Sequence, residues 1–105
     1  MDEGAVTKAI GVLEHVRKRR TMFLGTSSEP AVQLFLMGFR SACQSIGWPI
    51  TLELRREATW KRGWGFPAVG PASEMRERGY TEAQVVDELL MIEIITLQLL
   101  LAPSA

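Results

Sequence analysis

The chain has 105 residues, of which 47% are hydrophobic and 23% are charged, a composition that excludes disorder over most of the length. We assign residues 1–105 to a single helical domain with a frayed tail at 102–105. The formal net charge is zero, which disfavours a bulk nucleic-acid binder. Residues 1–66 nevertheless carry 10 basic and 6 acidic side chains, and residues 67–105 carry 2 and 6. This asymmetry suits self-pairing or two different partners.

Two amphipathic helices are expected in the first half of the chain. Residues 5–20 repeat apolar side chains at helical spacing and end in a basic cluster. Gly25 breaks this pattern, and Pro30 occupies a first-turn position of a second helix over 29–46. Gly47 ends that helix, whose apolar stripe is wide enough to face a core.

The segment 50–60 fits two structures. Ile50, Leu52 and Leu54 alternate with polar residues, as in a strand, whereas Pro49 could begin a helix over the same residues. We favour the helix. Residues 61–71 contain three Gly and two Pro and are expected to form a loop.

The C-terminal third predicts a short helix over 71–78, ended by Gly79, and a long helix over 82–101. Thr81 and Gln84 have the spacing of a capping box at the start of the long helix. The whole pattern predicts an all-α fold, a small bundle of four or five helices, with a short β element around residues 50–60 as the alternative.

The long helix is apolar on almost every side after Leu89, so it is either the centre of the core or a contact to a second copy. Glu93 interrupts the apolar run, and a lone carboxylate is costly to bury. It therefore lies at a surface edge or pairs with an arginine of this chain or a neighbour. We expect a homo-oligomer through the C-terminal helix, with an interface made by Leu89, Ile92, Glu93, Leu97 and Leu100.

The single cysteine, Cys43, suits a reducing compartment, and no secretory signal is recognisable. The apolar run 89–101 is shorter than the roughly 20 residues that span a bilayer. We expect a cytoplasmic protein without membrane contact. With one histidine, His15, and no phosphate-binding or nucleophile motif, we assign no catalytic residue, no cofactor and no metal. A Cys43–His15 pair is about ten times less favoured than a buried thiol and a surface imidazole.

The segment from Leu13 to Gly25, Leu-Glu-His-Val-Arg-Lys-Arg-Arg-Thr-Met-Phe-Leu-Gly, resembles the N-terminal opening of gyrase-type topoisomerase ATPase domains. It is also similar to the opening of small bacterial proteins of the immunity or conflict-system kind. The resemblance covers about 35 residues. The ATPase helix carries a Glu and an Asn for water and magnesium, whereas residues 39–44 hold Phe-Arg-Ser-Ala-Cys-Gln. The departure argues against ATP hydrolysis.

Two segments are candidates for partner binding. In the first, Arg17–Phe23, the side chains of Met22, Phe23 and Leu24 fill the core beside solvated cations, or the cations form a positive patch that faces an acidic partner or the acidic end of a second copy. In the second, 55–66, the aromatic rings cover the core, form an interface hot spot, or stack on nucleic-acid bases. The core interpretation weighs most in both, and a protein interface is favoured over nucleic acid. The candidate partner-binding residues are Arg17, Arg19, Arg20, Arg55, Arg56, Trp60, Arg62 and Trp64.

We therefore expect a small protein-binding module, of the bacterial immunity, antitoxin or defence-accessory kind, that acts by stoichiometric binding or self-assembly. The alternative is a nucleic-acid-binding transcriptional regulator that uses the basic helix and the Trp/Arg segment. An enzyme is the third and least favoured class.

Overall fold

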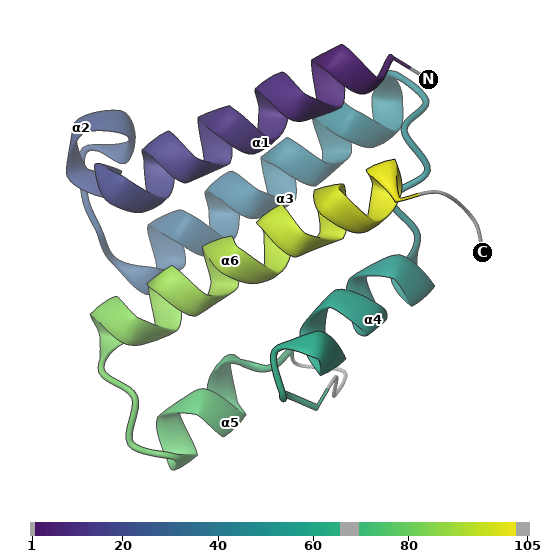
Figure 1. Ribbon diagram of the computed structural model, residues 1–105. Helices are drawn as coiled ribbons and strands as arrows, with labels where there is room; N and C mark the ends of the chain where they lie inside the picture. The colour runs from purple at the N-terminus through teal and green to yellow at the C-terminus, as the bar shows by residue number, and fades with distance from the viewer. Residues whose placement is uncertain (1, 66–69, 103–105) are drawn as a thin grey trace.

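A computed structural model describes residues 2–65 and 70–102 of the chain (Figure 1). These residues form an all-α bundle and contain no strand. The helices are α1 (Glu3–Lys18), α2 (Arg20–Leu24), α3 (Glu29–Ser45), α4 (Leu52–Lys61), α5 (Ala72–Glu77) and α6 (Glu82–Leu101). The predicted fold class is confirmed. Residues 66–69 of the expected loop and 103–105 of the expected tail lie outside the described residues.

Side-chain caps fix where the helices begin. The carboxylate of Asp2 accepts a hydrogen bond from the Ala5 amide at 3.1 Å, and the Ser28 hydroxyl caps α3 in the same way. At α6, the Thr81 hydroxyl accepts from the Gln84 amide at 3.2 Å, and the Gln84 side chain accepts from the Thr81 amide at 2.8 Å. The predicted capping box is therefore present, and it satisfies two amide groups that the first helical turn leaves without partners.

The helix over 50–60 is also confirmed, and its beginning explains why the strand does not form. The Thr51 hydroxyl accepts a hydrogen bond from the Leu54 amide at 3.1 Å, so α4 begins directly after an N-cap. Ala58 and Thr59 on this helix are buried, whereas Leu52 is exposed. The alternation of apolar residues at 50, 52 and 54 thus does not mark one buried face.

The expected helix over 5–20 is divided in two, which raises the number of helices among the described residues to six. Arg19 leaves helical geometry with φ −136°, and the five residues of α2 follow at once. Gly25 ends α2 with φ +74°, a left-handed conformation that favours glycine. The interpretation of Met22 and Phe23 as core residues is wrong, because α2 turns them outward, 67% and 51% exposed.

Helix α6 is the central element of the bundle. It packs against α1, α3, α4 and α5, and in Figure 1 it runs between α3 on one side and α4 on the other. Ten of its residues are buried, two of them acidic: Val85, Val86, Glu88, Leu89, Leu90, Ile92, Glu93, Ile94, Thr96 and Leu97. This apolar helix was expected to be either the centre of the core or a contact to a second copy. The structure shows that it forms the core of its own chain.

Along residues 2–65 and 70–102, none of the helices combines the length and the apolar character that crossing a membrane requires.

Candidate binding pocket

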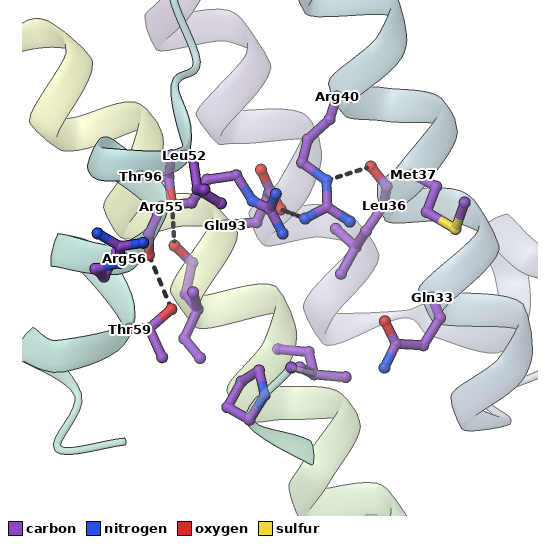
Figure 2. Close-up of a pocket in the computed structure, with 14 residues that line it drawn as sticks. Gln33, Leu36, Met37, Arg40, Leu52, Arg55, Arg56, Thr59, Glu93 and Thr96 are labelled. Atoms are coloured by element: carbon purple, nitrogen blue, oxygen red, sulfur yellow. Dashed lines mark hydrogen bonds and ion pairs between the residues drawn. The ribbon is translucent and has the colours of Figure 1, made fainter. Parts of the chain in front are cut away.

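A pocket of about 610 Å³ lies between α3 and α4, with α6 as its floor (Figure 2). It is present because α3 and α4, both fully described, pack on α6 without any Cα atoms closer than 8 Å to each other. The pocket walls are formed by apolar, polar and charged side chains together. The main apolar ones are Leu36, Met37, Leu52, Leu89 and Ile92, the polar ones are Gln33, Thr59 and Thr96, and the charged ones are Arg40, Arg55, Arg56 and Glu93.

The carboxylate of Glu93 lies deep in this pocket, and its side chain is only 4% exposed. Arg40 Nη1 lies 3.8 Å from Glu93 Oε1, too far for a hydrogen bond, while Arg40 Nε donates to the Leu36 carbonyl at 3.3 Å. Glu93 Oε2 has no hydrogen-bond partner among the described residues. The ion pair is thus held by charge rather than by a directed hydrogen bond, which leaves donors of Arg40 for other acceptors.

Burial dominates the ionisation of this group. It raises the pKa of Glu93 above the ordinary value of 4.5, and the positive charges of Arg40 and Arg55 act in the opposite direction. Burial and the nearby charge of Arg40 lower the pKa of Arg55, which still remains protonated at neutral pH. Arg40 and Arg55 approach Glu93 from α3 and α4 respectively (Figure 2). Two like charges therefore share one buried carboxylate.

The hydroxyl groups of the pocket are used within their own helices. Thr59 Oγ1 donates to the Arg55 carbonyl at 2.8 Å, and Thr96 Oγ1 donates to the Ile92 carbonyl at 2.8 Å (Figure 2). The side-chain donors that remain for a ligand therefore include the Nη groups of Arg40 and the Gln33 amide.

The structure divides the eight predicted partner-binding residues into distinct groups. Near the end of α1, Arg17 donates two hydrogen bonds to Asp87 of α6, at 2.9 and 3.1 Å. Arg20 lies 3.7 Å from the same carboxylate and donates to the Arg17 carbonyl, whereas Arg19 is exposed. Two of the three α1–α2 arginines are therefore tied to this chain's own α6.

Arg62 and Trp64 are likewise engaged within the chain. Glu88 accepts two hydrogen bonds from Arg62, at 2.9 and 2.6 Å, and a third from the Trp64 indole at 2.9 Å. The Trp64 ring is 4% exposed and lies between Tyr80, at 5.2 Å edge-on, and the Arg78 guanidinium, 4.6 Å from the ring centroid. Trp64 is a core residue, so its assignment to a partner surface is corrected.

The remaining candidates lie together on α4. Arg55 and Arg56 line the pocket, and the Arg56 guanidinium lies 5.9 Å from the centroid of the Trp60 ring. Trp60 is 59% exposed. The structure therefore places three of the eight predicted residues at one surface.

The residues predicted for an oligomer interface lie mainly inside the chain. Leu89, Ile92, Glu93 and Leu97 are 7%, 8%, 3% and 0% exposed, and Leu100 is half-buried. Helices α1, α3 and α4 cover them, because an apolar helix in a bundle is covered by its neighbours. These side chains are not an exposed interface in this structure, and self-association through α6 stays a prediction.

Three pocket residues were not predicted from the sequence as site residues: Arg40, Met37 and Leu52. The signal for Arg40 was present: it lies four residues after Leu36 and three before Cys43, so it interrupts an apolar stripe much as Glu93 does. Two opposite charges in two apolar stripes indicate a buried pair. No comparable signal marks Met37 and Leu52, since apolar residues on a helix are usually part of a core.

His15 and Cys43 have separate environments. Cys43 is buried, and burial together with the negative charge of Glu93 raises the pKa of its thiol. His15 is exposed and lies 6.5 Å from the Phe23 ring. Over the described part of the chain, no cluster of His, Cys, Asp or Glu side chains is arranged to hold a metal ion.

Comparison with protein family models, with curated proteins and with solved structures gave no significant match. The resemblance to gyrase-type openings and to small bacterial immunity proteins therefore stays a prediction.

Proposed function

We propose that this chain is a protein-binding module that acts by stoichiometric binding, and that it docks its partner on the surface of α3 and α4 around the pocket. The supporting observation is a set of large, exposed apolar side chains on these two helices. Met37 and Leu52, 58% and 52% exposed, line a pocket that contains three arginines, and Trp60, 59% exposed, lies beside one of these arginines, Arg56.

The composition of this surface favours a protein partner. Trp and Arg are the residues most enriched at the energetic centres of protein interfaces. Arg56 stacks against Trp60, which restricts both side chains before a partner arrives.

Stoichiometric binding is also the mode of action expected of a bacterial immunity, antitoxin or defence-accessory protein. Nucleic-acid binding has less support, because Arg17, Arg20 and Arg62 already pair with Asp87 and Glu88. Self-assembly through α6 has less support too, since the chain's own helices cover the side chains that it would need.

Site-specific photo-crosslinking in the native cells tests the proposal. A photoreactive phenylalanine analogue replaces Met37 in one variant and Val12, 48% exposed on α1, in the control. We expect one protein to be crosslinked at stoichiometric yield from position 37 only, with no change after nuclease treatment. A crosslink to nucleic acid or to a second copy, or equal crosslinking from both positions, would overturn the proposal.

The purified partner then allows a measurement of affinity. Trp60→Ala is expected to raise the Kd by at least about tenfold, because truncating a central interface Trp typically has that effect. Tyr80→Ala is the control, since Tyr80 is 38% exposed and packs on Trp64, away from the pocket. An unchanged Kd for Trp60→Ala would remove α4 from the docking surface.

A further inference from the structure

We infer that the pocket between α3 and α4 recognises a carboxamide, supplied as a Gln or Asn side chain of the protein partner with an apolar residue beside it. The inference rests on the proposed function and gives the site its chemical specificity. It is carried by the hydrogen-bonding groups of Glu93 and Arg40 that lack partners, by the charge balance between these two residues and by the apolar walls of the pocket.

The buried carboxylate of Glu93 requires a hydrogen-bond donor. Its side chain is only 4% exposed, yet Oε2 has no hydrogen-bond partner among the described residues, and Oε1 lies 3.8 Å from Arg40 Nη1, beyond hydrogen-bond distance. A buried acceptor without a partner is costly, and most such groups in folded proteins are satisfied. Glu93 lines the pocket, and its carboxylate rotates readily about its last bond, so a donor that enters the pocket can reach it.

Arg40 adds a requirement for an acceptor. Its Nε donates to the Leu36 carbonyl at 3.3 Å, and its Nη groups make only the long ion pair with Glu93 among the described residues (Figure 2). An occupant can serve both Glu93 and Arg40 only if its donor and its acceptor are on neighbouring atoms. A carboxamide has this arrangement, because its NH₂ group donates to the carboxylate while its carbonyl oxygen accepts from the guanidinium group.

The charge of the site favours a neutral occupant. Ionised Glu93 is balanced by Arg40, and Arg55 and Arg56 have interactions of their own. A ligand carboxylate would place a second acceptor against Glu93, and a ligand ammonium group would add a positive charge beside Arg40. Burial also raises the pKa of Glu93, and a protonated carboxyl group pairs with an amide through two hydrogen bonds. A carboxamide therefore matches both forms of Glu93.

The walls require more than a carboxamide. A volume of about 610 Å³ is far larger than one amide group and lies in the range of ordinary ligand pockets. Met37 and Leu52 line it from α3 and α4, with Ile92 on the floor helix. A Gln or Asn side chain with an apolar neighbour fills both parts, because the neighbour covers Met37 and Leu52 while the amide extends to Glu93.

Three small probes test the inference with the intact protein: isocaproamide, isocaproate and isohexylamine. They share one branched apolar chain and differ in the head group, which is an amide, a carboxylate or an ammonium group. Binding is followed by NMR through the Nε–Hε resonance of Arg40. We expect isocaproamide to bind with a Kd on the order of 1 mM, about tenfold more tightly than either charged probe. No binding of isocaproamide, or binding of a charged probe that is equally tight or tighter, would overturn the inference.

Variants of Glu93 assign the binding of isocaproamide to hydrogen bonds in the pocket. Glu93→Leu removes the acceptor and should raise the Kd about tenfold, whereas Glu93→Gln keeps an acceptor and should leave the Kd close to that of the wild type. Glu57→Leu, at an exposed acidic residue of α4 outside the pocket, is the matched control and should have no effect. If Glu93→Leu fails to fold because Arg40 loses its counter-charge, the double variant Arg40→Leu/Glu93→Leu takes its place. An unchanged Kd in the leucine variant, or an equal loss in Glu93→Gln, would contradict the inference.

The crosslinked partner identifies the source of the amide. Replacing the Gln and Asn residues next to its crosslinked position by Leu, one at a time, should raise the Kd about tenfold at one position for the wild-type chain and have no effect for Glu93→Leu. Crosslinking from position 37 without such a residue would retain a protein-binding surface and reject the amide site. Binding of isocaproamide without any crosslinked protein would retain the chemistry of the site and reject the protein partner.

Discussion

Replacing Glu88 by Ala should destabilise the fold, because this carboxylate joins two separate segments of the chain. It accepts two hydrogen bonds from Arg62 at 2.9 and 2.6 Å and one from the Trp64 indole at 2.9 Å. Glu88 and Trp64 are 8% and 4% exposed. The alanine variant therefore leaves a buried indole N–H without its acceptor, as well as an uncompensated arginine.

The size of the effect follows from the exposure of the two donors. A buried donor left without a partner costs about 1–3 kcal/mol. The Arg62 side chain is 40% exposed and can turn toward water, so losing its ion pair adds about 0–1 kcal/mol. The expected loss is about 1–4 kcal/mol in the free energy of unfolding. For a chain of this size, each kcal/mol lowers the Tm by roughly 4–8 °C.

Urea unfolding followed by circular dichroism measures this loss, with Glu57→Ala as the matched control. Glu57 is an exposed acidic residue on α4, and its replacement should change the free energy of unfolding by less than about 0.5 kcal/mol. If Glu88→Ala unfolds within that same margin of the wild type at neutral pH, Glu88 does not join the segments as described.

The pH dependence of the loss is also fixed in sign. Burial on its own raises the pKa of Glu88, but hydrogen bonds from Arg62 and Trp64 outweigh it and bring the pKa below 4.5. The stabilisation by ionised Glu88 is therefore present above about pH 4.5 and is lost as the pH falls through the lowered pKa. The difference in the free energy of unfolding between the wild type and Glu88→Ala should therefore become smaller as the pH is lowered.

Three further predictions concern single groups. Burial raises the pKa of Glu93 despite the opposing charges of Arg40 and Arg55. The stability that comes from the protonated Glu93 carboxyl is therefore present below about pH 4.5 and is lost as the pH rises through the raised pKa. Urea unfolding of Glu93→Gln, which cannot titrate there, should thus show rising stability relative to the wild type as the pH is raised, and a constant difference would contradict this. Thr81→Ala removes the capping box and should lower the free energy of unfolding by about 1 kcal/mol, whereas Thr81→Ser should restore most of it. Cys43, buried and with a raised pKa, should react with a thiol reagent slowly in the folded protein and fast in urea; fast reaction without denaturant would place the thiol at the surface.

Local interactions made most helix boundaries predictable. The capping box at Thr81 and the N-caps before α3 and α4 involve residues three positions apart, so the sequence contains both partners of each hydrogen bond. Gly25 and Gly79 end their helices for a reason that is equally local, a positive φ. The division of α1 from α2 at Arg19 was not predictable, because no glycine or proline marks it.

The candidate site was predictable only in part. Arg55, Arg56 and Trp60 were recognised because aromatic and basic residues close together are typical of binding surfaces. Arg62 and Trp64 belong to the same run, yet they turn inward to Glu88, which is more than twenty residues away in the sequence. Composition along a segment says what the segment could bind, but not which of its side chains faces the solvent.

The fold class, the capped helices and the apolar character of α6 follow from local sequence patterns, because each depends on residues that lie within a few positions of one another. Tertiary packing alone decided that α6 is covered by its own chain and that Arg17, separated from Asp87 by 70 positions, pairs with it. It also decided that α3 and α4 lie on α6 with none of their Cα atoms within 8 Å of each other, which opens the pocket above Glu93. These features depend on how whole helices pack, and many side chains distributed over the chain set that packing together.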